Sequence, residues 1–213
     1  MKERTRIKIC GVREPLHARI AADAGADAVG LVFHAASPRN VTLDEACAVA
    51  AALPPFVMAV GLFVDAPRAT IEGALAAVRL DLLQFHGDEP PEFCASFGIP
   101  FLKAIRMESG TDLLEWAHRF SRAKALLLDA HVPGQPGGTG QTFDWGSVPG
   151  DLPLPIVLSG GLDAANVGRA MREVKPWAVD VSSGVEARRG TKDPQKILNF
   201  IRSVRLEDAK SSR

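Results

Sequence analysis

Residues 56–64 read FVMAVGLFV, an almost unbroken apolar run. A strand with one solvated face alternates apolar and polar residues, whereas a strand covered on both faces stays apolar throughout. Seven further short runs, most of them equally apolar, are spread along the chain: RIKIC (6–10), DAVGLVF (27–33), LDLLQFH (80–86), FLKAIRM (101–107), AKALLLDA (123–130), LPIVLSGG (154–161) and WAVDVSSG (177–184). We therefore predict eight strands in a parallel sheet.

Helical patterns follow seven of the eight runs, at residues 15–26, 43–53, 68–78, 91–98, 111–120, 163–174 and 194–204. Thr42 with Glu45 has the spacing of a capping box, and Asp193-Pro194 is typical of a helix start. The exception is the Gly- and Pro-rich stretch 131–151, with at most one short helix around 143–146. Strand and helix patterns that alternate through eight strands in about 200 residues predict a single closed (β/α)8 TIM barrel over residues 1–205. A doubly wound open sheet is the alternative, and residues 206–213 are expected to form a disordered tail.

Charge and composition exclude several classes of function. Lys+Arg and Asp+Glu each number 25, so no global charge attracts nucleic acid or an anionic membrane. The polar start MKERTR has no signal-peptide core, and no apolar run is long enough to span a bilayer, which predicts a cytoplasmic protein. Three distant cysteines and five histidines lack the spacing of a disulfide framework or a metal site. We expect no metal, and Cys47 and Cys94 are interpreted as core residues.

The active site of such a barrel lies at the carboxyl ends of its strands. In RIKIC, side chains alternate in direction, so Lys8 and Cys10 should point into the barrel while Ile7 and Ile9 face the helices. A cation just below a thiol favours the thiolate, the form that can accept a proton. An equally good interpretation is that Cys10 is inert filler and Lys8 extends to one end of the barrel.

Two more strand ends carry groups that can transfer protons. Asp129 ends the sixth run and should face the barrel mouth, where a thiol and a carboxyl group would form a base and an acid; a turn-capping aspartate is the common alternative. His86 ends the fourth run with Gln84 on the same face. It could bind a ligand or carry a proton, but a structural histidine is at least as good an interpretation.

Three glycine-rich segments follow the sixth, seventh and eighth runs: PGGTGQTF (136–143), LSGGLDAANV (158–167) and DVSSGVE (180–186). Their backbone N–H groups could surround a phosphate, and the loops after strands seven and eight are a frequent phosphate site in barrels. None of them is a Walker loop or a full dinucleotide fingerprint. Arg39, in the loop after the second run, would suit a carboxylate, although a solvated loop arginine is the simpler interpretation.

Together these motifs resemble the phosphoribosylanthranilate isomerase family of tryptophan biosynthesis. The motifs are KICG (8–11), SPR (37–39), QFHGDE (84–89), LLLDA (126–130), GGTGQTFDW (137–145), LSGGL (158–162) and DVSSGVE (180–186). Asn40 departs from the aromatic residue that the family often has there. The resemblance implies a cofactor-free Amadori rearrangement of a small phosphorylated substrate, with Asp129 as general acid and Cys10 as general base.

The resemblance also implies the binding groups. Arg39 would bind the anthranilate carboxylate, and Asp180, with His86 beside it, would contact the ribosyl group. The phosphate would be held around Gly138, Gly160, Gly161, Ser183 and Gly184. These roles require a raised pKa for Asp129 and a lowered pKa for Cys10.

Two other functions are consistent with a barrel of this kind. The related sugar-phosphate isomerase of histidine biosynthesis uses two aspartates, which is disfavoured because Cys10 ends the first run and no carboxylate ends the fifth. A barrel that binds a phosphorylated metabolite without turnover would lack the acid or the base. The sequence does not distinguish a monomer from a homodimer.

Overall fold

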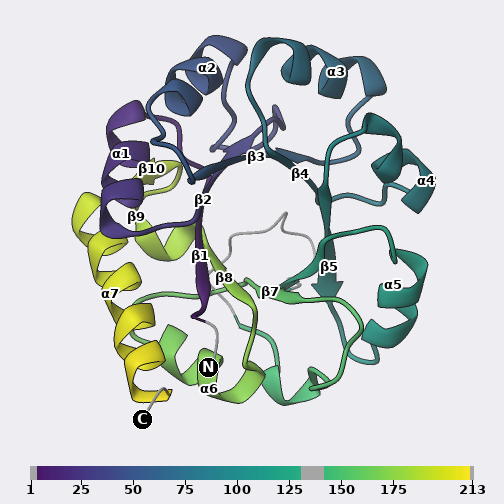
Figure 1. The fold of residues 1–213 in the computed structure, drawn as a ribbon, viewed down its shortest axis with the longest axis vertical. Helices are drawn as coiled ribbons and strands as arrows, with labels where there is room; N and C mark the ends of the chain where they lie inside the picture. The colour runs from purple at the N-terminus through teal and green to yellow at the C-terminus, as the bar shows by residue number, and fades with distance from the viewer. Residues whose placement is uncertain (1–3, 131–141, 212–213) are drawn as a thin grey trace.

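The eight predicted strands form one closed parallel barrel (Figure 1). The computed structural model describes residues 4–130 and 142–211. Each strand pairs with the next, and β8 pairs with β1, with Lys8 opposite Asp180, so the closed barrel is confirmed and the open sheet is wrong. The strands are β1 (Arg6–Cys10), β2 (Ala28–Val32), β3 (Met58–Phe63), β4 (Leu82–Phe85), β5 (Phe101–Met107), β6 (Ala125–Ala130), β7 (Ile156–Leu158) and β8 (Ala178–Val181).

Helices surround the barrel on the outside (Figure 1). They are α1 (Pro15–Ala24), α2 (Leu43–Ala51), α3 (Arg68–Ala77), α4 (Pro91–Cys94) continued by η1 (Ala95–Phe97), α5 (Leu113–Arg119), α6 (Val167–Val174) and α7 (Pro194–Ser211). Between β6 and β7 the described residues hold only the short η2 (Trp145–Ser147), and after β8 come η3 (Ser183–Val185) and a hairpin of β9 (Glu186–Arg188) and β10 (Thr191–Lys192). No helix of the described chain could cross a membrane.

Side-chain direction follows strand parity, as predicted. Ile7 and Ile9 are fully buried in the large core between the sheet and the helices. The barrel interior holds a separate apolar layer that includes Leu102, Leu127 and Val157. Above it, Cys10 packs with Val32, Leu62 and Val64. The polar residues of the strands therefore meet at the carboxyl end of the barrel, above a filled interior.

Local signals in the sequence place the helix ends. Thr42 and Glu45 form both hydrogen bonds of the capping box at the start of α2. Asp193 Oδ1 accepts a hydrogen bond from the Lys196 N–H at the start of α7. Cys94 is fully buried in the core, as expected. Cys47 is only half-buried, and its Sγ donates to the Ala77 carbonyl at 3.2 Å.

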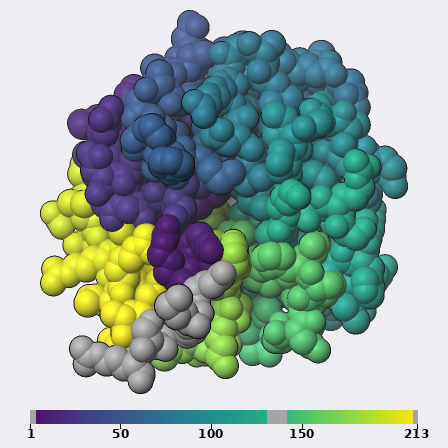
Figure 2. All heavy atoms as spheres, viewed as in Figure 1, coloured from purple at the N-terminus to yellow at the C-terminus, as the bar shows by residue number. Residues whose placement is uncertain are grey.

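The C-terminal segment corrects the prediction of a tail, because α7 continues to Ser211. Figure 2 shows this helix, in yellow, beside the purple N-terminal residues. Asp208 accepts hydrogen bonds from the Thr5 N–H at 3.1 Å and the Thr5 hydroxyl at 2.8 Å. Glu207 is buried against Arg172 at 2.8 Å. These partners lie far away in the sequence, so a local pattern could not indicate that the segment is ordered.

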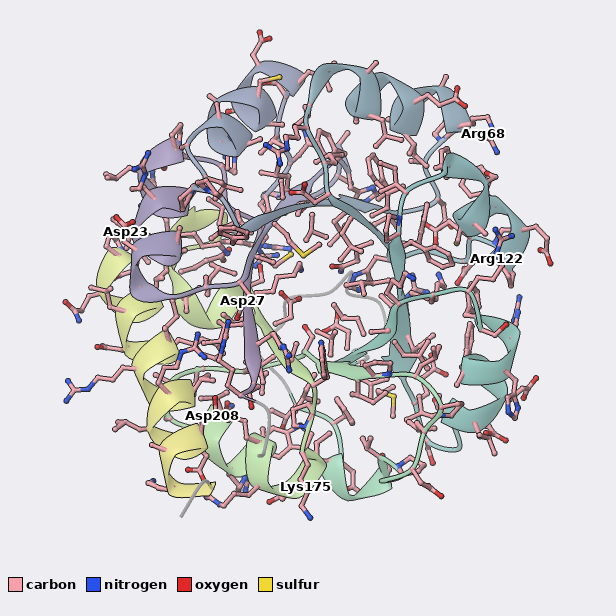
Figure 3. The ribbon with its side chains drawn as sticks, viewed as in Figure 1. Asp23, Asp27, Arg68, Arg122, Lys175 and Asp208 are labelled. Atoms are coloured by element: carbon pink, nitrogen blue, oxygen red, sulfur yellow. The ribbon has the colours of Figure 1, made fainter. Side chains whose placement is uncertain are left out.

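We predict that Asp208→Ala lowers the free energy of unfolding by about 1–3 kcal/mol, because it leaves the part-buried Thr5 donors without their acceptor. Urea denaturation followed by circular dichroism measures the change. Asp23→Ala is the matched control, since Asp23 is exposed on α1 and points away from the barrel (Figure 3). It should change stability by less than about 0.5 kcal/mol. Equal stability of the two variants would contradict the role of Asp208.

Candidate active site

A pocket opens at the carboxyl ends of the barrel strands. Residues at the ends of seven of the eight strands line it: Cys10, Val64, His86, Arg106, Asp129, Ser159 and Ser182. At the end of β2, Phe33 instead faces the helices and stacks on Phe63, with ring centroids 5.1 Å apart. The thiol of β1 and the carboxyl group of β6 therefore face one cavity, as expected.

Cys10 lies above a buried ion pair. Lys8 Nζ donates to Asp180 Oδ1 at 2.9 Å, and both side chains are 5% exposed. Ser159 Oγ donates to the other Asp180 oxygen at 3.5 Å. Gly30 on the neighbouring strand makes room for the thiol, because a Cβ there would be 2.7 Å from Cys10 Sγ. The interpretation that Lys8 extends to the end of the barrel is therefore wrong.

The expected lowering of the Cys10 pKa is also wrong. Burial raises the pKa of the thiol, and the cations of Lys8 and Lys192 offset only part of this effect. Lys8 lowers the Cys10 pKa less than its proximity suggests, because its charge is already paired with Asp180. Burial by itself lowers the pKa of Lys8, but the ion pair with Asp180 opposes this, the pKa lies above its ordinary value, and Lys8 stays an ammonium. In the free protein Cys10 is a neutral thiol at neutral pH.

Asp129 is held in a short chain of side chains. Its Oδ2 lies 3.1 Å from His86 Nε2, and His86 Nδ1 lies 3.0 Å from the Gln84 amide nitrogen. Because an amide nitrogen only donates, His86 Nδ1 is the acceptor and Nε2–H donates to Asp129. Gln84 is fully buried, which fixes the ring from below. The structure therefore brings His86 to the predicted acid.

A second buried ion pair supports the loop that carries His86. Lys103 Nζ donates to Glu89 Oε2 at 2.9 Å and to the Gly87 carbonyl. Glu89 in turn accepts hydrogen bonds from the N–H groups of Gly87 and Asp65. A Cβ at Gly87 would lie 2.3 Å from an Asp65 oxygen, so this close approach requires glycine. The loops after β3 and β4 are thus joined behind the pocket.

Arg39 is buried rather than solvated. It is 8% exposed and lines the pocket. Its Nε donates to Glu186 Oε1 at 2.7 Å and its Nη2 to Glu186 Oε2 at 3.0 Å. The side chain crosses Gly11, where a Cβ would be 2.6 Å from Arg39 Cδ and where φ is +74°. The solvated-loop interpretation is therefore wrong, and the guanidinium is fixed at the pocket wall.

Glycines shape the wall after β7 and β8. Gly160 and Gly161 have φ of +83° and +64°, a conformation that side chains rarely adopt, and both line the pocket with Ser183. Gly184 lies behind them, where a Cβ would be 2.0 Å from the Leu162 carbonyl oxygen. Gly138 is outside the described residues. Among residues 4–130 and 142–211, no cluster of His, Cys, Asp and Glu could hold a metal ion.

Sequence reasoning gave no role to three charged residues of this region. Glu186 lies within the DVSSGVE motif, but its partner Arg39 is 147 residues away. Lys192 precedes the Asp193-Pro194 helix start and is 3% exposed, although nothing in its neighbourhood in the sequence predicts burial. Arg189, at the turn of the β9–β10 hairpin, is exposed and lines the pocket. The place of Arg189 at the pocket depends on the β9–β10 hairpin, which the sequence pattern did not predict.

Comparison with known proteins gives one consistent family. The sequence model of the N-(5′-phosphoribosyl)anthranilate (PRA) isomerase family matches residues 7–203. An isomerase of that name from Thiobacillus denitrificans is 59% identical over 198 residues, which are 92% of this chain and 96% of the relative. The crystal structure of phosphoribosyl anthranilate isomerase from Thermotoga maritima has a TM-score of 0.86 and 39% identity, covering 95% of this chain and 99% of that one.

A further solved structure holds a ligand. It is phosphoribosyl anthranilate isomerase in complex with reduced 1-(o-carboxyphenylamino)-1-deoxyribulose 5-phosphate. It has a TM-score of 0.82 and 37% identity, and covers 95% of this chain and 99% of that chain.

We predict that the Cys10 thiol titrates above its ordinary value near 9.0, because burial disfavours the thiolate. The ultraviolet absorbance of the thiolate, taken as wild type minus Cys10→Ser, measures this pKa. Lys8→Met should raise it further, since the variant removes a nearby cation. A midpoint below that of an ordinary cysteine, or a decrease in Lys8→Met, would contradict the electrostatics described.

Proposed function

Because this chain belongs to the N-(5′-phosphoribosyl)anthranilate (PRA) isomerase family, we propose that Asp129 and Cys10 are the acid and base of its Amadori rearrangement. The chain is an isomerase of tryptophan biosynthesis that acts on a small phosphorylated substrate. The single observation that carries the assignment is that a thiol from β1 and a carboxyl group from β6 line one pocket.

Asp129 starts the reaction in this proposal. Its carboxylic acid protonates the furanose ring oxygen, the C1′–O bond breaks, and the anthranilate nitrogen supplies the electron pair that forms the iminium. The His86 Nε2–H group lies 3.1 Å from Oδ2, so it stabilises the carboxylate that remains after proton transfer. His86 would also lie beside the ribosyl group, because its ring lines the pocket.

Cys10 completes the rearrangement. Its thiolate removes the C2′ proton, the electron pair forms the C1′=C2′ bond of an enolamine, and tautomerisation gives the ketose. The thiolate is a minor form in the free protein, because burial raises the pKa of Cys10. The iminium formed by ring opening is a cation beside the thiol and favours its ionised form.

Binding groups are arranged around these two residues. Arg39 would hold the anthranilate carboxylate, and Asp180 would accept hydrogen bonds from the ribosyl hydroxyls. In the ring of strands, β7 and β8 lie between β6 and β1. Their loops would hold the phosphate, through the backbone of Gly160 and Gly161 and through Ser183, with Gly184 keeping the two loops close together. Gly138 remains part of this proposed cradle on sequence grounds alone.

The other functions considered receive less support. The histidine-pathway isomerase would need a carboxylate at the end of β1, where this chain has Cys10. A binding barrel without turnover would not need a thiol and a carboxyl group facing one cavity. We further propose that the enzyme works in the cytoplasm, without metal or cofactor, as a monomer or a homodimer.

We predict that purified protein converts phosphoribosylanthranilate without added metal or cofactor. Cys10→Ser and Asp129→Asn should each lower kcat by about 10²–10⁴-fold, because each removes one proton-transfer group. The loss of substrate fluorescence measures the rate, and circular dichroism checks that each variant is folded. Cys94→Ser is the matched control for the thiol, because Cys94 is buried in the outer core, away from the pocket. Full activity in either variant would remove that residue from the mechanism.

We also predict that Gly30→Ala lowers kcat by about 10²-fold. The new methyl group would lie 2.7 Å from Cys10 Sγ and 3.1 Å from Cys10 Cα, so the thiol must move. Gly73→Ala on α3 is the matched control, since a Cβ there meets nothing within 4 Å. Steady-state kinetics of both variants tests the prediction. Wild-type kcat in Gly30→Ala would show that the position of the thiol is not critical.

A further inference from the structure

Three charged side chains form a buried chain behind one wall of the pocket. Arg39, Glu186 and Lys192 are 8%, 7% and 3% exposed. Arg39 donates twice to Glu186, and Lys192 Nζ donates to Glu186 Oε1 at 2.9 Å. Only Arg39 of the three lines the pocket. The arrangement therefore places a cation, an anion and a second cation in order, with the first cation at the pocket surface.

The guanidinium keeps one edge for a ligand. It has five N–H groups, and Glu186 accepts from Nε and Nη2. The remaining N–H groups include a fork made by Nη1 and Nη2, which matches a carboxylate. Within the described chain, Nη1 forms no hydrogen bond. Arg39 can thus hold a second carboxylate while Glu186 fixes its orientation.

Neither Glu186 nor Lys192 has capacity to spare for a ligand. Glu186 Oε2 also accepts from the Gly190 N–H at 3.2 Å, and Oε1 is shared by Arg39 and Lys192. Lys192 donates to the Ser182 carbonyl at 2.9 Å and to the Ser182 hydroxyl at 3.3 Å. With Glu186, these contacts use all three N–H groups of an ammonium. Both residues must act through Arg39.

The net charge of the cluster explains why Lys192 is needed beside Arg39 and Glu186. Glu186 is ionised, because hydrogen bonds from Arg39 and the Lys192 cation outweigh burial and lower its pKa. A buried Arg39–Glu186 pair alone has no net charge and would attract a carboxylate weakly. Burial lowers the pKa of Lys192, but its hydrogen bond to the Glu186 carboxylate opposes that effect, and as an ammonium Lys192 brings the cluster to a net charge of +1. The cluster is buried, so the effective dielectric constant around it is low. The charge therefore attracts a carboxylate at Arg39 more strongly than the same charge would in water.

We infer that Lys192 supplies the charge, and Glu186 the orientation, that allow Arg39 to select a substrate with a carboxylate on its aryl amine. Both are positioning residues, and the hairpin of β9 and β10 is the element that brings them to the site. This inference rests on the proposed function, in which Arg39 binds the anthranilate carboxylate. A purely structural ion cluster would stabilise the hairpin without affecting the choice of ligand.

The test compares two ligands that differ in one group. They are reduced 1-(o-carboxyphenylamino)-1-deoxyribulose 5-phosphate and the same compound without its carboxyl group. Isothermal titration calorimetry gives the ratio of their Kd values for wild type, Lys192→Met and Lys192→Arg. The ratio cancels effects on phosphate and sugar binding. Lys196→Met is the matched control, because Lys196 is exposed and, among the residues that the structure describes, donates only to the Glu186 main-chain carbonyl, at 2.8 Å.

We expect wild type to prefer the carboxylated ligand and Lys192→Met to lower that preference about tenfold, since a close buried charge is lost. Lys192→Arg and Lys196→Met should keep most of it. If Lys192→Met does not fold, Lys192→Gln, which keeps donors for Ser182 and Glu186, should show the same loss.

One outcome would overturn the inference alone: a preference that stays unchanged in the neutral Lys192 variants, including the case in which both ligands bind more weakly by the same factor. Wild type would then still prefer the carboxylated ligand and convert phosphoribosylanthranilate. A wild type that shows neither preference nor turnover would instead overturn the proposed function.

Discussion

Closure of the sheet between β1 and β8 is the constraint on which the site depends. The pairing sets Lys8 opposite Asp180, and their side chains form an ion pair in the barrel interior. A buried ion left without its partner costs about 3–5 kcal/mol, so the pair favours this one register. Because closure makes the first and last strands neighbours, Cys10 lies beside Asp180. The hairpin that follows β8 reaches the Arg39 loop, where Gly190 packs against the Pro38 carbonyl.

Much of this arrangement could be predicted by counting along strands. Side chains alternate strictly in a strand, so the inward positions of Lys8, Cys10 and Asp129 followed once eight covered strands were recognised. The carboxyl ends of parallel strands lie at one end of a barrel, which brought distant polar residues to one pocket. Glycines at 160 and 161 also carried a readable signal, because positive φ is difficult for other residues.

Interactions between distant loops could not be predicted in the same way. Glu186 and Arg39 pair across 147 residues, and no local pattern links a hairpin after β8 to a loop after β2. The direction of the Cys10 pKa was missed for a related reason. The predicted proximity of Cys10 to Lys8 was correct. The pairing of Lys8 with Asp180 and the depth at which Cys10 is buried, however, depend on the whole barrel. The same applies to α7, whose last turns are ordered by Thr5 and Arg172.

The pairing of β1 with β8 also matters while the chain is being made. Lys8 and Asp180 are separated by 172 residues, so β1 leaves the ribosome long before its second neighbour exists. Until then one edge of β1 has backbone donors and acceptors without partners, a state in which strands adhere to other chains. Nascent-chain chaperones would therefore be needed most during the interval between the emergence of the first strand and that of the eighth.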